Sequence, residues 1–241
     1  MEFEFTGISP AILSAYNAYQ RKEDLVERKY QLLKSVLNAN NNDGGSILFL
    51  GFDPWILGDW SPRHVFVGLI TDEVANYLDD NNVLYTRLYD DEIHNTIPFD
   101  VVVAADEMLT YAENDQRDRV DLLSELANEL FITTLRDYKN QAPQSRDFSQ
   151  PTVIKNDDDF SVFMEYHHYE YKVKSHWTSY IYENGSQINT YGGFKRQPMF
   201  FKQLAKFAYD AGAVNFTIHR DLMFKSLLKK NYEHLISVSF K

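Results

Sequence analysis

Residues 46–55, with the sequence SILFLGFDPW, are the stretch from which the fold of this chain is inferred. A continuous apolar run leads into Gly51 and then into an Asp-Pro pair, which favours a turn. Such a run predicts a strand over 46–52 that is covered on both faces, as in a parallel sheet. Ligands of open parallel sheets bind just beyond the carboxyl ends of these strands. The turn 51–58 is therefore the first candidate for a small-molecule site.

Downstream of this strand, apolar strand-like runs alternate with helical segments. The expected strands are 64–70, 83–89, 99–105 and 130–135, and the expected helices are 10–37 before the first strand and then 71–80 and 116–128. Five strands that alternate with helices indicate βαβ units with right-handed crossovers. The first half of the chain therefore predicts a mostly parallel sheet, with the Asp90-Asp91-Glu92 segment as a polar loop.

The character of the sequence changes after a polar loop at 137–150. Residues 152–191 are rich in aromatic and β-branched residues and contain the turn sequence Asn184-Gly185. This part predicts an antiparallel meander. The expected elements are strands at 160–171, 173–182 and 187–191, then a helix at 196–212 and two final strands at 214–219 and 234–240.

The order of elements resembles the class I S-adenosylmethionine-dependent methyltransferase family. Four segments carry the similarity: SILFLGFDP behind its leading helix, FDVVVAADEMLTY at 99–111, RVDLLSELANELFITTL at 119–135, and the ending FFKQLAKFAYDAGAVNFTIH…HLISVSF at 200–240. In that family the last two strands form a reversed hairpin at the edge of the sheet. The resemblance implies an α/β fold of three layers. Its mostly parallel, seven-stranded, Rossmann-like sheet would carry a reversed last hairpin and an antiparallel β insertion.

We expect a single methyltransferase-like domain over residues 1–241. Its expected parts are an N-terminal helical lead (1–45), a parallel βαβ core (46–136), an antiparallel β extension (150–192), and a closing helix with the terminal strands (194–241). The resemblance implies S-adenosylmethionine as the cofactor.

The cofactor turn of the family has an acidic residue at the end of the first strand and then two or three glycines. On this chain the acidic position falls on Phe49 and the first glycine is Gly51. The next two glycine positions fall on Asp53 and Trp55. The resemblance implies that Gly51, Phe52 and Asp53 contact the cofactor, although glycines normally let the backbone approach it closely.

Carboxylates near the next strand ends are further cofactor candidates. The family's ribose-binding acid falls on Ile70, and Asp72 follows two residues later. Asp72 either reaches the ribose through a shifted turn or caps helix 71–80, a role that Thr71 also suits. Asp90 and Asp91 match the place where the family binds the adenine amino group, and they also suit a merely solvated loop.

Asp106 follows the fourth strand, where a carboxylate would face the ammonium of the cofactor or a substrate amine. Glu107 and Tyr111 are candidate substrate contacts; their alternatives are a helix N-terminal acid and a packing aromatic. His176 is a candidate substrate residue, and one of His167, His168 and His176 is a candidate general base. A metal site with His167 or His168 lacks tight ligand spacing, so we expect no metal. We name no catalytic residue, because methyl transfer depends mostly on proximity and orientation.

Composition limits the classes of function. The 241 residues are 44% hydrophobic and carry a net charge of −11, which argues against general nucleic-acid binding. The chain has no cysteine, no apolar run of about 18 residues, and an acidic start unlike a signal peptide. We expect a cytoplasmic protein that does not enter membranes. The aromatic strands suit core packing or a homodimer surface.

Two functions follow from these observations. The first is S-adenosylmethionine-dependent methyl transfer to a small molecule or a protein side chain. The second is a catalytically inactive protein of the same fold that acts as a binding or assembly module, because Phe49, Asp53, Trp55 and Ile70 replace the usual motif residues. A dehydrogenase would need a GxGxxG turn, which is missing. A pocket lined by Asp90 or Asp91 favours the enzyme, and a pocket filled by Trp55 or Phe52 favours the binding module.

Overall fold

The chain folds around two β-sheets, of seven and four strands. The computed structural model describes residues 25–40, 42, 44–104, 109, 116–136, 152–156, 160–168, 175–183, 186–196, 199–225 and 232–241. The strands of the larger sheet are β1 (Ser46–Leu50), β2 (His64–Gly68), β3 (Thr86–Leu88), β4 (Phe99–Ala104), β5 (Ala127–Arg136), β10 (Asn215–Lys225) and β11 (Tyr232–Ser239).

The larger sheet has the strand order β10-β11-β5-β4-β1-β2-β3. Strands β1 to β5 pair in parallel. Strand β11 is antiparallel to β5 on one side and to β10 on the other, so β10 runs parallel to β5. The expected mostly parallel seven-stranded sheet with a reversed last hairpin is confirmed.

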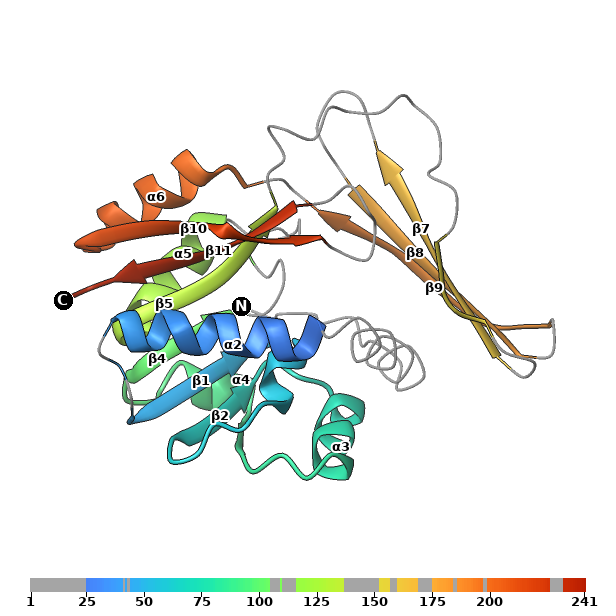
Figure 1. Ribbon diagram of the computed structural model, residues 1–241, viewed down its shortest axis with the longest axis horizontal. Helices are drawn as coiled ribbons and strands as arrows, with labels where there is room; N and C mark the ends of the chain where they lie inside the picture. Colours follow the sequence, from blue (N-terminus) through green and yellow to red (C-terminus); the bar gives the residue numbers. More distant parts are fainter. Residues whose placement is uncertain are drawn as a thin grey trace.

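Helices cover both faces of this sheet and complete three layers. One face carries α2 (Leu25–Ala39), the short 3-10 helix η1 (Pro54–Leu57) and α3 (Asp72–Asp80), and the other carries α4 (Asp90–Ile93), α5 (Gln116–Leu126) and α6 (Phe201–Asp210). Figure 1 shows α2 lying across one face of the sheet.

Strand β1 lies inside the sheet, between β4 and β2, and this position explains why its sequence is apolar after Ser46. Ile47 and Phe49 pack into the core beneath α2, while Leu48 and Leu50 pack into the core on the opposite face. All four side chains are buried. Alternation along a strand sends successive side chains to opposite faces, so a strand between two helical layers needs apolar residues at every position.

The four-stranded antiparallel sheet lies between β5 and α6 in the sequence. Its strands, in sheet order, are β6 (Thr152–Asn156), β7 (Phe160–His168), β8 (Ser175–Glu183) and β9 (Ser186–Arg196). Because it follows β5, the insertion leaves the larger sheet at the carboxyl ends of the parallel strands. Figure 1 shows it to one side of the three-layer core.

Several element boundaries differ from the expected ones. Strand β6 was not expected as a separate element. Strand β9 runs to Arg196, because it pairs with β8 as far as Ser175, the first residue of β8. Helix α6 consequently begins at Phe201 instead of 196. The expected loop at residues 90–92 is the start of α4, where the Glu92 carboxylate accepts a hydrogen bond of 2.8 Å from the Tyr89 N–H.

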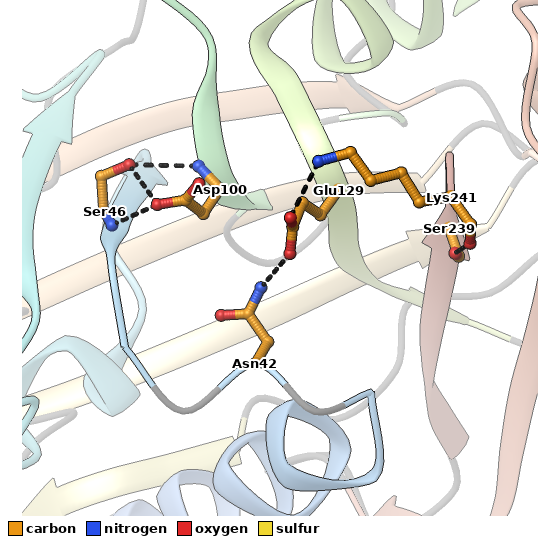
Figure 2. Close-up of polar contacts among 6 residues, drawn as sticks. All are labelled: Asn42, Ser46, Asp100, Glu129, Ser239 and Lys241. Carbon is orange, nitrogen blue, oxygen red and sulfur yellow. Dashed lines mark hydrogen bonds and ion pairs between the residues drawn. The ribbon is translucent and has the colours of Figure 1, made fainter.

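The amino ends of the central strands are joined by polar side chains (Figure 2). The backbone N–H and the hydroxyl of Ser46 donate to Asp100 Oδ2 at 2.7 and 3.1 Å. Nearby, Glu129 accepts hydrogen bonds from Asn42 Nδ2 at 3.1 Å and from Lys241 Nζ at 2.9 Å. The bonds from Ser46 lower the pKa of the Asp100 carboxyl.

Among the helices that the structure describes, none combines the length and the apolar character needed to cross a bilayer.

Candidate functional site

The turn after β1 depends on glycine. Gly51 has φ = 76°, a left-handed conformation that costs other residues about 1 kcal/mol or more. Its N–H donates a hydrogen bond of 2.9 Å to the carbonyl oxygen of Gly68, the last residue of β2. The turns that follow the two central strands are therefore held side by side at the carboxyl edge of the sheet.

The turn after β2 has an unusual conformation. Leu69 has φ = 54°, although its side chain is buried in the core with Leu50 and Ile93. A bulky residue in the left-handed region is strained, and such strain persists only where the surrounding packing determines the conformation. The chain leaves β2 by a left-handed bend before it enters α3.

Helix α3 begins with Thr71 as its N-cap, whose hydroxyl oxygen accepts a hydrogen bond of 3.4 Å from the Val74 N–H. Asp72 is the first residue of the helix and not the cap, so the capping role considered for it is wrong. Its side chain is 83% exposed and pairs with Arg87 of β3, with 2.7 Å between Nη1 and Oδ1. Asp72 therefore presents a carboxylate at the carboxyl edge of the sheet.

The acids after β3 lie in the first turn of α4. Asp90 and Asp91 are both exposed there. Tyr89, which precedes them, is largely exposed, and the Arg87 guanidinium lies 4.9 Å from the centre of its ring. Carboxylates and an aromatic ring thus follow β3 where the adenine-binding acid was expected, and Arg87 of the strand lies beside the ring.

The remaining residues of the β1 turn are buried. Asp53 Oδ2 forms an ion pair of 3.1 Å with Lys29 Nζ of α2, and the two side chains are only 1% and 5% exposed. Asp53 Oδ1 also accepts a hydrogen bond of 3.4 Å from the Trp55 N–H at the start of η1. The position of the family's second glycine is thus occupied by a side chain that ties α2 to the turn.

Trp55 and Phe52 extend this packing. Trp55 is fully buried, with Lys29 Nζ 5.7 Å from its ring centre, and its carbonyl oxygen accepts a 3.0 Å hydrogen bond from Trp60 Nε1. Phe52 packs edge-on against Tyr77 of α3, with the ring centres 5.8 Å apart. The third glycine position and the residue after Gly51 are therefore part of the core between α2, η1 and α3.

Lys29 was missed in the sequence. It lies one helical turn before Leu33, on the apolar side of α2 that faces the core. A charged residue on the apolar stripe of an amphipathic helix is the signal by which it could have been found. Gln116 and Gln203 were also missed: they join the starts of α5 and α6 through a 3.0 Å hydrogen bond from Gln203 Nε2 to Gln116 Oε1.

The other candidates are placed only in part. Asp106, Glu107 and Tyr111 lie outside the described residues. His176 belongs to β8, where its backbone is directly opposite that of His167 of β7. Within the described ranges, no three His, Cys, Asp or Glu side chains gather as a metal site.

No protein-family model matches the chain, and no curated protein matches its sequence. Solved structures do match. A sugar N-methyltransferase from a Streptoalloteichus species is 7% identical, with a TM-score of 0.68 over 99% of this chain and 95% of its own. An amino pentose methyltransferase from Micromonospora echinaspora, solved with S-adenosylmethionine bound, is 9% identical, with a TM-score of 0.66 over 94% of this chain and 96% of its own.

An S-adenosylmethionine-dependent methyltransferase from Clostridium acetobutylicum is 12% identical, with a TM-score of 0.64 over 93% of this chain and 98% of its own. These matches span nearly the whole chain. The chain therefore has the fold of the class I S-adenosylmethionine-dependent methyltransferases, as its element order implied.

Proposed function

We propose that this chain binds S-adenosylmethionine at the carboxyl edge of its larger sheet and transfers the methyl group to a small molecule. The left-handed turn at Gly51 carries the proposal, because this is the one glycine of the cofactor motif that the chain keeps. A backbone that bends there without a side chain lets a ligand approach the end of β1 closely.

Four carboxylates would complete the cofactor site. Asp72 suits the ribose hydroxyls, since its carboxylate is exposed beside the turn that follows β2. Asp90 and Asp91 suit the adenine amino group, and Asp106 suits the ammonium of the methionine part. Hydrogen bonds from polar ligand groups to carboxylates are the stronger kind of hydrogen bond, which supports these roles.

The cofactor, when bound, supplies an electrophilic methyl group on its sulfonium. The chain would orient an acceptor nitrogen or oxygen toward that methyl group and accept the proton that the acceptor releases. His176, in the smaller sheet that follows β5, is our candidate for the proton acceptor. A small-molecule acceptor is supported by structural neighbours whose names give a sugar and an amino pentose as their substrates.

A second candidate function is binding or assembly without methyl transfer. The buried Asp53 carboxylate, paired with Lys29, and the buried Trp55 ring favour it, because Asp53 and Trp55 occupy the two positions where the motif has glycine. A turn packed in this way leaves less room for the methionine part of the cofactor.

Calorimetric titration with S-adenosylmethionine and S-adenosylhomocysteine tests the proposal. We expect micromolar binding to the wild type and about tenfold weaker binding by the Asp91→Ala and Asp106→Ala variants. Glu125→Ala is the matched control, since Glu125 is an exposed acid near the carboxyl end of α5. That end leads into the first residue of β5, at the edge of the sheet opposite to the candidate site. Absence of binding at millimolar ligand would contradict the enzyme and support the binding module.

A further inference from the structure

The first carboxylate after β2 lies two residues further along this chain than in the resembling family, and the structure shows why. The expected position holds Ile70, whose side chain packs against the core. The left-handed bend at Leu69 redirects the chain, so the first carboxylate is that of Asp72, at the start of α3. A displaced carboxylate on an exposed helix start needs another group to fix its direction.

Arg87 is in a position to fix it. The guanidinium spans the bend: Nη1 donates to Asp72 Oδ1 at 2.7 Å, and Nη2 donates to the Ile70 carbonyl oxygen at 3.1 Å. The same group lies over the ring of Tyr89, 4.9 Å from its centre. One side chain from β3 therefore links the strand end, the bend and the helix start.

The two members of the ion pair are unequally held. Arg87 is only 22% exposed and has the carbonyl oxygen and the aromatic ring as further contacts, whereas Asp72 is 83% exposed. The arginine therefore orients the carboxylate, and not the reverse. Among the described residues, Asp72 Oδ2 accepts no hydrogen bond, so one carboxylate oxygen is left for a ligand.

We infer that Arg87 is a positioning residue that holds Asp72 for hydrogen bonding to the ribose hydroxyls of the cofactor. The inference rests on the proposed function. An ion pair whose carboxylate is exposed contributes little to stability, so the bond to Asp72 serves to direct the carboxylate more than to stabilise the fold. A guanidinium fork gives a fixed direction that an ammonium does not, which is why arginine suits this position.

The test is the preference for the ribose 2′-hydroxyl, measured by calorimetry with S-adenosylhomocysteine and its 2′-deoxy analogue. We expect the wild type to bind the first about tenfold more tightly than the second. Arg87→Met should bind the two compounds almost equally, and so should Arg87→Lys, which keeps the charge but not the fork. Asp72→Asn should reduce the preference as well, and adding Arg87→Met to it should cause no further loss.

Arg63→Met is the control, because Arg63 binds Asn42 and Gly44 at the opposite edge of the sheet. It should keep the tenfold preference whatever it does to the melting temperature. A preference that survives in Arg87→Met and Arg87→Lys, or that is absent from a wild type that binds both compounds, overturns the inference but not the proposed function. A wild type that binds neither compound overturns both.

Discussion

At the scale of single residues, Gly51 and Leu69 reach similar backbone conformations by different means. Both have positive φ, 76° and 54°, at the ends of neighbouring strands. Gly51 adopts its angle at little steric cost, because it has no Cβ. Leu69 is strained there and is kept in place by its burial in the core that also contains Leu50 and Ile93.

The Gly51→Ala variant should be destabilised by about 1 kcal/mol, because its Cβ would meet the backbone in the left-handed region. It should also weaken binding of S-adenosylhomocysteine. Urea unfolding measures the first effect and calorimetry the second. Gly44→Ala is the control, since a Cβ on Gly44 would meet no atom within 4 Å. Equal stability of the two variants would contradict the importance of the turn.

The sequence identified the residues of this edge better than their partners. Gly51 and the displaced Asp72 were recognisable, because turns and helix starts have local signals. The partnership of Asp53 with Lys29 was not, since it joins residues of different elements and lysines on helices usually point to solvent. The role of Arg87 depends on the bend at Leu69, which no local pattern predicts for a leucine.

At the scale of elements, the amino ends of β1 and β4 are fixed by side chains as well as by the ladder. Asp100 accepts two hydrogen bonds from Ser46, and the Ser46 hydroxyl accepts one of 3.1 Å from the Asp100 N–H. Gly45 directly precedes Ser46 and has φ = 85°, and a Cβ on Gly45 would lie 2.2 Å from Asp100 Oδ2. The carboxylate therefore occupies the space that glycine leaves free.

This contact predicts a dependence of stability on pH. The pKa of Asp100 is lowered in the folded protein, chiefly by the Ser46 N–H, so the folded state binds its proton less readily than the unfolded state. The stabilisation is present above the unfolded pKa of about 3.9 and is lost as pH falls through the lower folded pKa. Urea midpoints between about pH 6 and 3 should therefore fall less steeply for Asp100→Asn than for the wild type.

Exposed Asp80 provides the comparison for this experiment. Asp80→Asn should follow the pH profile of the wild type. Parallel profiles for Asp100→Asn and the wild type would show that the Ser46 contact contributes no pH dependence.

The elements predicted best were those with long apolar runs. Strands β1 and β4 were predicted closely, because they are buried on both faces and are apolar except for Ser46 and Asp100 near their amino ends. Strand β3, at the edge of the sheet, is only Thr86–Leu88 instead of 83–89. The residues on either side of it have strand-like character, but among the described elements β3 has β2 on one side and no strand on the other. β-Propensity by itself does not define a strand.

At the scale of the whole molecule, charge is the dominant global property. The chain has 35 acidic and 24 basic residues, which gives the net charge of −11. Exposed ion pairs such as Arg87–Asp72 and Lys241–Glu129 are each worth about 0 to 1 kcal/mol, and salt weakens them. Repulsion among the excess acids acts over the entire surface and is weakened by salt as well.

We therefore expect repulsion among the excess acids to affect stability more than attraction within the exposed ion pairs does. The melting temperature should rise by a few degrees when NaCl is increased from about 10 to 300 mM, and it should then level off because the Debye length has become short. Calorimetric melting at constant pH measures this rise. A continued increase at molar salt would indicate a salting-out effect instead, and a falling melting temperature would contradict the prediction.

The position of β11 in the sheet has a consequence for synthesis on the ribosome. A growing chain releases β5 first, then β10, and only afterwards β11, the strand that separates them. Until β11 is free, β5 has an open edge and β10 has no strand beside it among the described elements. Unpaired strand edges recruit strands of other chains. The nascent protein should therefore be most in need of chaperones in the interval between the release of β5 and that of β11.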